Sequence, residues 1–155
     1  MDRNFERIVN TYADMLFRIA LHYLKNTSDA EDAVQQTFLK IIEKNMHFES
    51  FDHEKAWLIR VCTNLCKDSL KSSHRKKTQP LQTDADKIYS DAEDFYIMDH
   101  IRTLPHKQKI AIYLFYYENM SVKEIADTMQ EKQNTVLSSL NRGRKKLAKL
   151  LKEEL

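Results

Sequence analysis

The chain has a single glycine and two prolines in 155 residues, and this scarcity limits its possible folds more than any other feature. Tight turns between β-strands depend on residues that tolerate a positive φ, above all glycine next to asparagine or aspartate. A sheet protein of this length needs many such turns, and this chain has almost nothing to build them from. A hydrophobic fraction of 42% is still enough for real cores. We therefore predict an all-α protein.

Apolar residues recur at helical spacing through most of the chain. In residues 5–24 they form one stripe, with polar side chains opposite it, which is typical of an amphipathic helix. Ser28 and Glu31 match a capping box that would start a second helix. Asp52 is the predicted N-cap of a third helix, which carries the only tryptophan, Trp57.

Residues 78–92 interrupt this pattern with a proline, several aspartates and weak periodicity. Such a stretch is typical of a linker at a domain boundary. We therefore expect two small helical domains, residues 1–77 and 93–155, joined by a flexible linker.

Charge is spread unevenly along the chain, although the formal net charge is only +2. Residues 1–75 are balanced, residues 76–100 carry a net charge of −3, and residues 101–155 carry +5. The C-terminal part is therefore where a polyanion such as DNA would bind.

The second domain contains the pattern of a helix-turn-helix. Ser121 and Glu124 match a capping box, and the short helix that they start carries the small residue Ala126. After a polar turn, Val136 and Leu140 would anchor a longer helix on the same core. This layout favours a DNA-binding helix-turn-helix. The alternative is an ordinary three-helix bundle with a solvated basic face.

The outward face of that last helix has the side chains that DNA recognition uses. Hydroxyl, amide and guanidinium groups pair with base edges in the major groove, and cations neutralise phosphates. The residues predicted to face outward are Thr135, Ser138, Asn141, Arg142 and Lys145. The further cations available to phosphates are Arg144, Lys146 and Lys149.

The helix that carries Trp57 separates into an apolar and a polar face. Cys62 and Cys66 lie one turn apart on the apolar face, where we expect them to pack as small hydrophobic side chains. The polar face carries an aromatic ring, an amide and four cations, namely Trp57, Arg60, Asn64, Lys67, Lys71 and Arg75. Such a set suits a nucleic-acid backbone and unstacked bases. It is equally open that the tryptophan packs into the core and the cations are merely solvated.

Neither a metal site nor a cofactor site is expected. The cysteines and histidines do not occur at zinc-site spacing, and no glycine-rich phosphate loop or Ser/His/Asp arrangement is present. These features disfavour an enzyme. The chain opens on charged residues without a signal-peptide pattern and has no long apolar run, so we expect a cytoplasmic protein without membrane insertion.

Four motifs resemble, in the same order, those of bacterial sigma factors. They are Asp29-Ala-Glu-Asp-Ala-Val-Gln-Gln-Thr-Phe-Leu-Lys, Trp57-Leu-Ile-Arg-Val-Cys-Thr-Asn64, Leu104-Pro105 and Ser121-Val-Lys-Glu-Ile-Ala. Over about residues 5–151 the chain is similar to the short, two-domain extracytoplasmic-function (ECF) group of the sigma-70 family. The resemblance implies a transcription initiation factor, not an enzyme, that binds core RNA polymerase and directs it to promoter DNA.

The resemblance also assigns a role to each domain. The first would correspond to sigma region 2, whose second helix docks on the coiled coil of the polymerase β′ subunit. The implied polymerase-binding residues are Asp29, Asp32, Gln35, Gln36 and Phe38. The polar face of the tryptophan helix would hold the −10 element and aid its melting.

The second domain would correspond to sigma region 4, which would read the −35 element and have the polymerase β flap as a further partner. The implied −35 residues are Thr135, Leu137, Ser138, Ser139, Asn141, Arg142, Arg144 and Lys145.

Three residues depart from the family pattern. Gln36 stands where the family often has an acidic residue, and Leu137 and Ser139 stand where cations are frequent, so the family's base preferences do not carry over directly. Many members are held by an anti-sigma protein, and the sequence leaves open whether this chain has one. The main alternative is a stand-alone helix-turn-helix regulator that never contacts polymerase. A helical adaptor without DNA binding is another.

Overall fold

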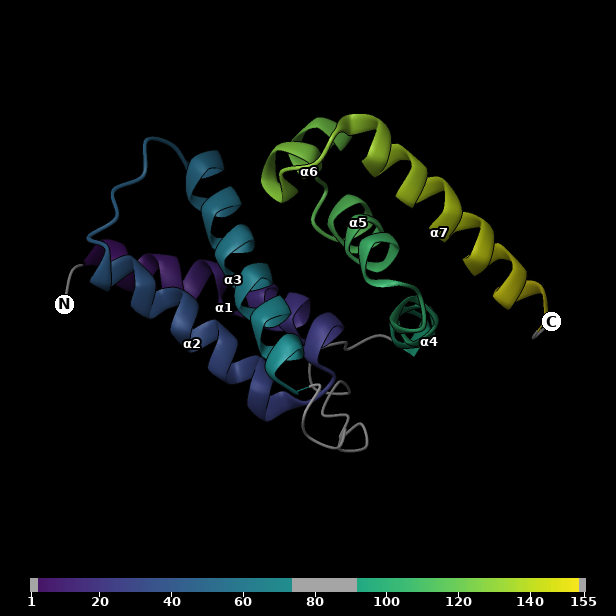
Figure 1. Cartoon of the computed structure of the whole chain (residues 1–155), viewed down its shortest axis with the longest axis horizontal. Helices are drawn as coiled ribbons and strands as arrows, with labels where there is room; N and C mark the ends of the chain where they lie inside the picture. Colours follow the sequence, from purple (N-terminus) through teal and green to yellow (C-terminus); the bar gives the residue numbers. More distant parts are fainter. Residues whose placement is uncertain (1–2, 74–91, 154–155) are drawn as a thin grey trace. The chain divides into compact units, whose positions relative to one another are not determined.

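The computed structural model describes residues 3–73 and 92–153, which form seven α-helices and no β-strand. The all-α prediction is therefore confirmed. The chain divides into two units, Met1–Asp84 and Ala85–Leu155 (Figure 1). The predicted linker, residues 78–92, lies outside the described residues except for Ala92, which begins a helix.

The first unit is a bundle of three helices in which each helix packs on the other two. They are α1 (Arg3–Leu24), α2 (Thr27–Glu43) and α3 (Phe51–Ser73). The core takes the apolar stripe of α1 and one face of α3, including Ile8, Met15, Leu16, Ile19, Leu58, Ile59, Cys62 and Cys66. Burying a large aliphatic side chain contributes about 1.5–3 kcal/mol, so packing stabilises these helices more than their intrinsic propensity does.

The starts of α2 and α3 differ from the sequence prediction. Asn26, not Ser28, caps α2: its Oδ1 accepts a hydrogen bond from the backbone N–H of Asp29 at 2.8 Å, and its Nδ2 donates to the Asp29 carboxylate. At α3, Ser50 rather than Asp52 provides the side-chain cap, because its Oγ accepts from the backbone N–H three residues further on at 3.1 Å. Both helices begin earlier than predicted because a second good capping residue stands just before the predicted one.

The second unit is built around a buried central helix. Its helices are α4 (Ala92–Arg102), α5 (His106–Tyr116), α6 (Val122–Met129) and α7 (Gln133–Glu153). Helix α5 lies between α4 and the pair formed by α6 and α7 (Figure 1). Its residues 110–114 are all buried, as expected of a helix that has neighbours on every side.

Helices α6 and α7 form the predicted helix-turn-helix. The capping box at the start of α6 is confirmed, since Ser121 Oγ accepts from the Glu124 N–H and Glu124 Oε1 accepts from the Ser121 N–H, both at 3.1 Å. At the other end Gln130 adopts a left-handed conformation with φ of 56°, and its N–H donates to the carbonyl of Ala126. This conformation costs a residue with a side chain about 1–2 kcal/mol, and it turns the chain toward α7.

Candidate nucleic-acid interface

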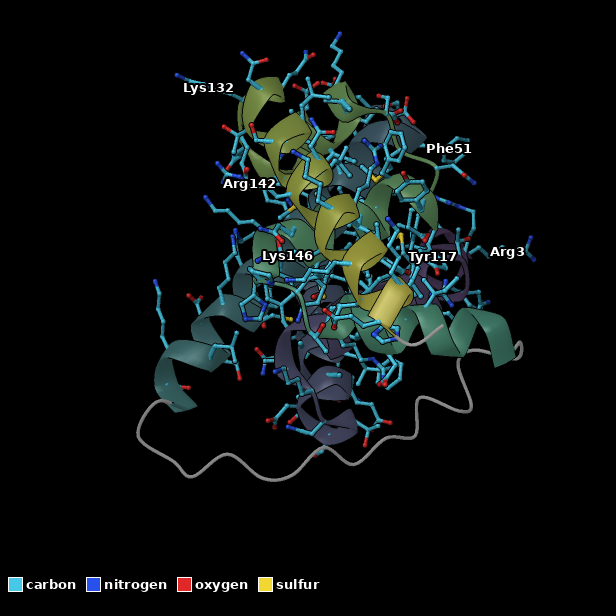
Figure 2. The ribbon with its side chains drawn as sticks, turned by 90° about the vertical axis from the view of Figure 1, so that its right-hand side faces the viewer. Arg3, Phe51, Tyr117, Lys132, Arg142 and Lys146 are labelled. Carbon is cyan, nitrogen blue, oxygen red and sulfur yellow. The ribbon has the colours of Figure 1, made fainter. Side chains whose placement is uncertain are left out.

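The face of α7 that points away from the core is polar and open. Val136, Leu140 and Gly143 are buried, and α7 packs on α5 and α6, which fixes the rotation of the helix about its axis. On the opposite face the exposed residues are Leu137, Ser138, Asn141, Arg142 and Lys145. Figure 2 shows Arg142 at the outer edge of α7. Except for Leu137, these side chains offer donors and cations to a ligand.

Three residues of the predicted −35 set are less exposed than this open face, namely Thr135, Ser139 and Arg144, of which Arg144 is half-buried. Ser139 is only 8% exposed, so it offers little surface to a ligand. It lies between Val136 and Leu140 in sequence and falls at the edge of their buried stripe. Thr135 is half-buried. The burial of Ser139 and Thr135 was not predictable from their type, because small hydroxyl side chains occur on both faces of a helix.

At Gly143 the helix α7 lies close against α5. A Cβ atom at this residue would lie 2.4 Å from Cδ1 and 3.2 Å from Cγ1 of Ile112. Real Cβ atoms do not approach other atoms this closely, so the absence of a side chain is what admits Ile112. The glycine thereby helps to set how the outward face of α7 is presented.

Arg144 is held by aromatic and polar side chains. Its Nε donates to Tyr116 Oη at 2.6 Å and its Nη1 donates to Asn141 Oδ1 at 3.2 Å. Its Cζ also lies 5.4 Å from the ring centroid of Phe115 and 5.5 Å from that of Tyr116, within cation–π range. The sequence placed Arg144 among the phosphate-binding cations and missed Tyr116, which lies 28 positions earlier.

The polar face of α3 is partly open. Trp57 is half-buried, and its ring centroid lies 5.4 Å from that of Phe48 in the segment before α3. Arg60 is half-buried, whereas Asn64, Lys67 and Lys71 are exposed. The predicted contact Arg75 lies outside the described residues. The structure therefore gives the tryptophan a packing partner and leaves an amide and two lysines in solvent.

An ion pair joins the start of α3 to α1. Arg7 donates from Nη2 to Glu54 Oε2 at 2.7 Å and from Nη1 to Oε1 at 3.0 Å, although Glu54 is only 3% exposed. A buried carboxylate needs such a partner. The hydrogen bond to Glu54 raises the pKa of Arg7. Burial, together with the negative charge of Glu54, raises the pKa of Tyr12 to about 12.

Of the five residues predicted to form the polymerase-binding face of α2, four are exposed and Phe38 is buried. The Phe38 ring meets that of Phe5 edge-on with centroids 6.5 Å apart, so it packs in the core of this unit. Asp32, Gln35 and Gln36 are exposed, and Asp29 is exposed as well while it bonds to Asn26 at the helix start.

Two exposed apolar residues extend this face. Leu39 is 52% exposed and Ile42 is 55% exposed. With Asp32 and Gln35 they follow the spacing i, i+3, i+7 and i+10, which places all four on one side of the helix. We call these four residues the α2 surface. The exposure of Leu39 and Ile42 was not predicted, because an apolar residue near a predicted stripe is expected to be buried.

Cys62 and Cys66 are both buried, which confirms that they pack as small apolar side chains. A hydrogen bond with Cys62, and then burial, raises the pKa of the Cys66 thiol, which keeps that thiol protonated. In the part of the chain that the structure describes, no three His, Cys, Asp or Glu side chains are grouped so as to hold a metal ion. Nor is any helix in the same residues both long and apolar enough to cross a bilayer.

Comparison with known protein families gives two matches in chain order. The family model of Sigma-70 region 2 matches residues 8–76, and that of Sigma-70 region 4 matches residues 94–147. The first match covers most of α1 and all of α2 and α3, and the second covers α5, α6 and most of α4 and α7.

Individual relatives agree with these matches. The chain is 28% identical to the ECF RNA polymerase sigma factor SigE of Mycolicibacterium smegmatis, over 93% of this chain and 60% of that protein. It is 27% identical to the ECF RNA polymerase sigma factor SigW of Bacillus subtilis, over 96% and 89%. The chain thus spans about three fifths of the mycobacterial relative and most of the other.

One solved structure has the same fold. It is the sigma factor RpoE from Bartonella quintana, crystallised in complex with the anti-sigma factor NepR. The TM-score is 0.77 at 22% identity, over 97% of this chain and 98% of the other.

Proposed function

The chain belongs to the extracytoplasmic-function group of the sigma-70 family of transcription initiation factors, and we propose a division of work among three of its helix faces. The α2 surface binds core RNA polymerase, the exposed face of α3 holds the −10 element, and the outward face of α7 reads the −35 element. The observation that carries this proposal is the exposed row on α7, in which hydroxyl, amide and guanidinium groups stand on a helix anchored by a capped α6.

The α2 surface suits a protein partner better than DNA. The carboxylate of Asp32 would be repelled by phosphates, whereas Leu39 and Ile42 offer apolar area that a partner helix can cover. Apolar residues ringed by polar ones are typical of protein-binding sites. We assign the coiled coil of the β′ subunit to this surface.

The exposed face of α3 suits a melted strand. Lys67 and Lys71 are placed to neutralise phosphates, and the amide of Asn64 can pair with the edge of an unstacked base. Trp57, supported by Phe48, presents an aromatic ring beside them. We assign the −10 element to this face.

The outward face of α7 suits the major groove of duplex DNA. Ser138, Asn141 and Arg142 are types that bond to base edges, and Lys145 lies where a phosphate can pair with it. Arg142→Ala should therefore weaken use of the −35 element by about 1–3 kcal/mol at preferred sequences. Lys152→Ala, which removes an exposed cation from the end of the same helix, is the matched control.

The proposal is tested by transcription in vitro from a genomic fragment library with the cognate core polymerase. We expect start sites preceded by two shared sequence elements about two helical turns of DNA apart, neither of which core polymerase uses alone. The same start sites with and without the protein would contradict the proposal.

A stand-alone helix-turn-helix regulator would bind DNA through α7 but would leave the α2 surface without a partner. The absence of a complex with core polymerase in a pull-down is the result that this alternative requires. Because polymerase and its template are cytoplasmic in bacteria, we place the protein in the cytoplasm.

A further inference from the structure

Arg144 borders the outward face of α7, and its contacts hold the side chain of Asn141, which lies on that face. The guanidinium is bonded to Tyr116 through Nε and to Asn141 through Nη1, and it lies against the rings of Phe115 and Tyr116. These two rings meet edge-on with centroids 5.0 Å apart. The guanidinium thus has four contacts that limit its movement. Through one of them it holds the amide of Asn141 in place.

The chemistry of arginine decides which end of the Asn141 amide points outward. A guanidinium has N–H donors and no acceptor, so the Asn141 atom that faces it must be the amide oxygen. The NH2 group then lies on the other side, where it has no hydrogen-bond partner among the described residues. Asn141 is exposed, so this group is available to a ligand.

A base in the major groove would therefore meet a donor. Asparagine pairs with adenine through two bonds, one of which requires its amide oxygen to accept from the adenine amino group. Here one lone pair of that oxygen already accepts from a cation, and the positive charge of Arg144 disfavours the approach of a further N–H donor, such as the adenine amino group, to the same oxygen. Adenine also presents the acceptor N7, but its amino group stands beside that atom and faces the positive charge. Guanine presents the two acceptors N7 and O6, and thymine presents O4, without this conflict.

We propose that Asn141 reads the −35 element as a donor, selecting guanine or thymine and rejecting adenine at one base position, with Arg144 and Tyr116 as the residues that position it. This inference rests on the proposed function, because it requires α7 to lie in the major groove. Leu137, exposed one turn before Asn141, adds an apolar side chain that can contact the methyl group of a neighbouring thymine.

The experiment uses the full chain with the cognate core polymerase and a promoter library in which six −35 positions are randomised. Transcripts are sequenced, and base frequencies are compared among variants. The base position read by Asn141 is the one that loses its base preference in Asn141→Ala. For the wild type we expect guanine or thymine to be enriched, and adenine depleted, at that position.

Arg144→Met should free the amide oxygen and move that position toward adenine by about tenfold in relative frequency, the effect of one good base contact. Tyr116→Phe removes only the hydroxyl that holds Arg144 and should shift the frequency in the same direction by less. Since Tyr116 is 51% exposed, this variant also carries the test if Arg144→Met fails to fold. Lys145→Met, which removes an exposed cation next to Arg144 in sequence, is the control and should lower transcription without a change of base preference.

Two results would overturn the inference while leaving the proposed function intact. One is enrichment of adenine by the wild type at the Asn141 position. The other is a loss of transcription in Arg144→Met and Tyr116→Phe that is the same for all promoter sequences, as expected for Lys145→Met, with no change of base preference. Transcription that is independent of all six positions would instead overturn both the −35 assignment and the inference, so the two failures are distinguishable.

Discussion

The contact between Gly143 and Ile112 joins α7 to the buried helix α5 of the second unit. Its contribution to stability can be tested directly. In Gly143→Ala the alanine gains about 1 kcal/mol in helix propensity, but its Cβ meets Cδ1 of Ile112, a side chain that is itself buried. Overpacking of this kind costs about 1–3 kcal/mol. We expect a net loss of about 1 kcal/mol in the free energy of unfolding of the second unit, measured by chemical denaturation followed by circular dichroism.

A second substitution provides the control for this prediction. Ile112→Val removes Cδ1, the atom nearest to the added Cβ, and alone costs about 0.5–1.5 kcal/mol. In the Ile112→Val background, Gly143→Ala should no longer destabilise the protein. Strictly additive effects would show that the contact is not the source of the loss.

Tyr12 makes the first unit sensitive to high pH. Its pKa is about 12 in the folded chain, because of burial and then the charge of Glu54, against the ordinary value of 10. The unfolded chain therefore loses the phenol proton first, and the contribution of Tyr12 to stability is full below pH 10 and is lost as the pH rises toward 12. The urea midpoint of the wild type should fall over this range more steeply than that of Tyr12→Phe.

Trp57 is the only tryptophan of the chain, so its fluorescence reports the unfolding of the first unit in this measurement. If the urea midpoint fell equally steeply with pH in the wild type and in Tyr12→Phe, Tyr12 would not be the source of the sensitivity to high pH.

At the scale of single helices, the α2 surface is the part whose substitution should separate binding from folding. Leu39→Arg replaces an exposed apolar side chain by a cation, so the helix should remain intact while the proposed polymerase contact loses apolar area. We expect the affinity for core polymerase to fall at least about tenfold, or about 1.4 kcal/mol, in a fluorescence anisotropy titration. Asn10→Arg, which adds the same charge at an exposed position of α1, should leave it unchanged.

Helical periodicity predicted the helices well, because each of them must bury one stripe of apolar side chains. Periodicity could not show which of two neighbouring residues at the edge of an apolar stripe is buried and which is exposed. Phe38 and Ile42 stand four positions apart on the same side of α2, yet Phe38 is buried against Phe5 and Ile42 lies in solvent. Which of the two is covered depends on where α1 packs, which the sequence of α2 does not contain.

The candidate sites were predictable to different degrees for the same reason. The exposed positions Asn141 and Arg142 follow from the rotation that the buried residues of α7 impose. The partnership of Arg144 with Tyr116 does not, because it depends on how two helices far apart in sequence meet. The residue types indicated which chemical groups line the outward face of α7. The packing of the helices determines which of these groups are left to bind a ligand.

At the scale of the whole molecule, the proposed assignment of separate tasks to separate helices predicts separable defects. Asn64→Ala removes an exposed amide from α3 and leaves the α2 surface untouched. We expect promoter opening, followed by permanganate reactivity of unpaired thymines, to fall several-fold while the affinity for core polymerase stays within a factor of two. Asn10→Ala, an exposed asparagine on α1, is the matched control.

Equal losses of opening and of polymerase affinity in Asn64→Ala would show that Asn64 contributes to assembly or folding rather than to the −10 contact.

The exposure of Leu39 and Ile42 also bears on how long the protein survives. Both side chains are more than half exposed when the chain is alone, and exposed apolar area promotes self-association. A partner that covers them and binds only the folded chain stabilises it, by about 2.7 kcal/mol when the partner is present at a hundred times its Kd. Molecules without a partner are then the ones that proteases and aggregation remove. The steady-state amount of this protein is therefore expected to follow the supply of vacant polymerase as well as its own rate of synthesis.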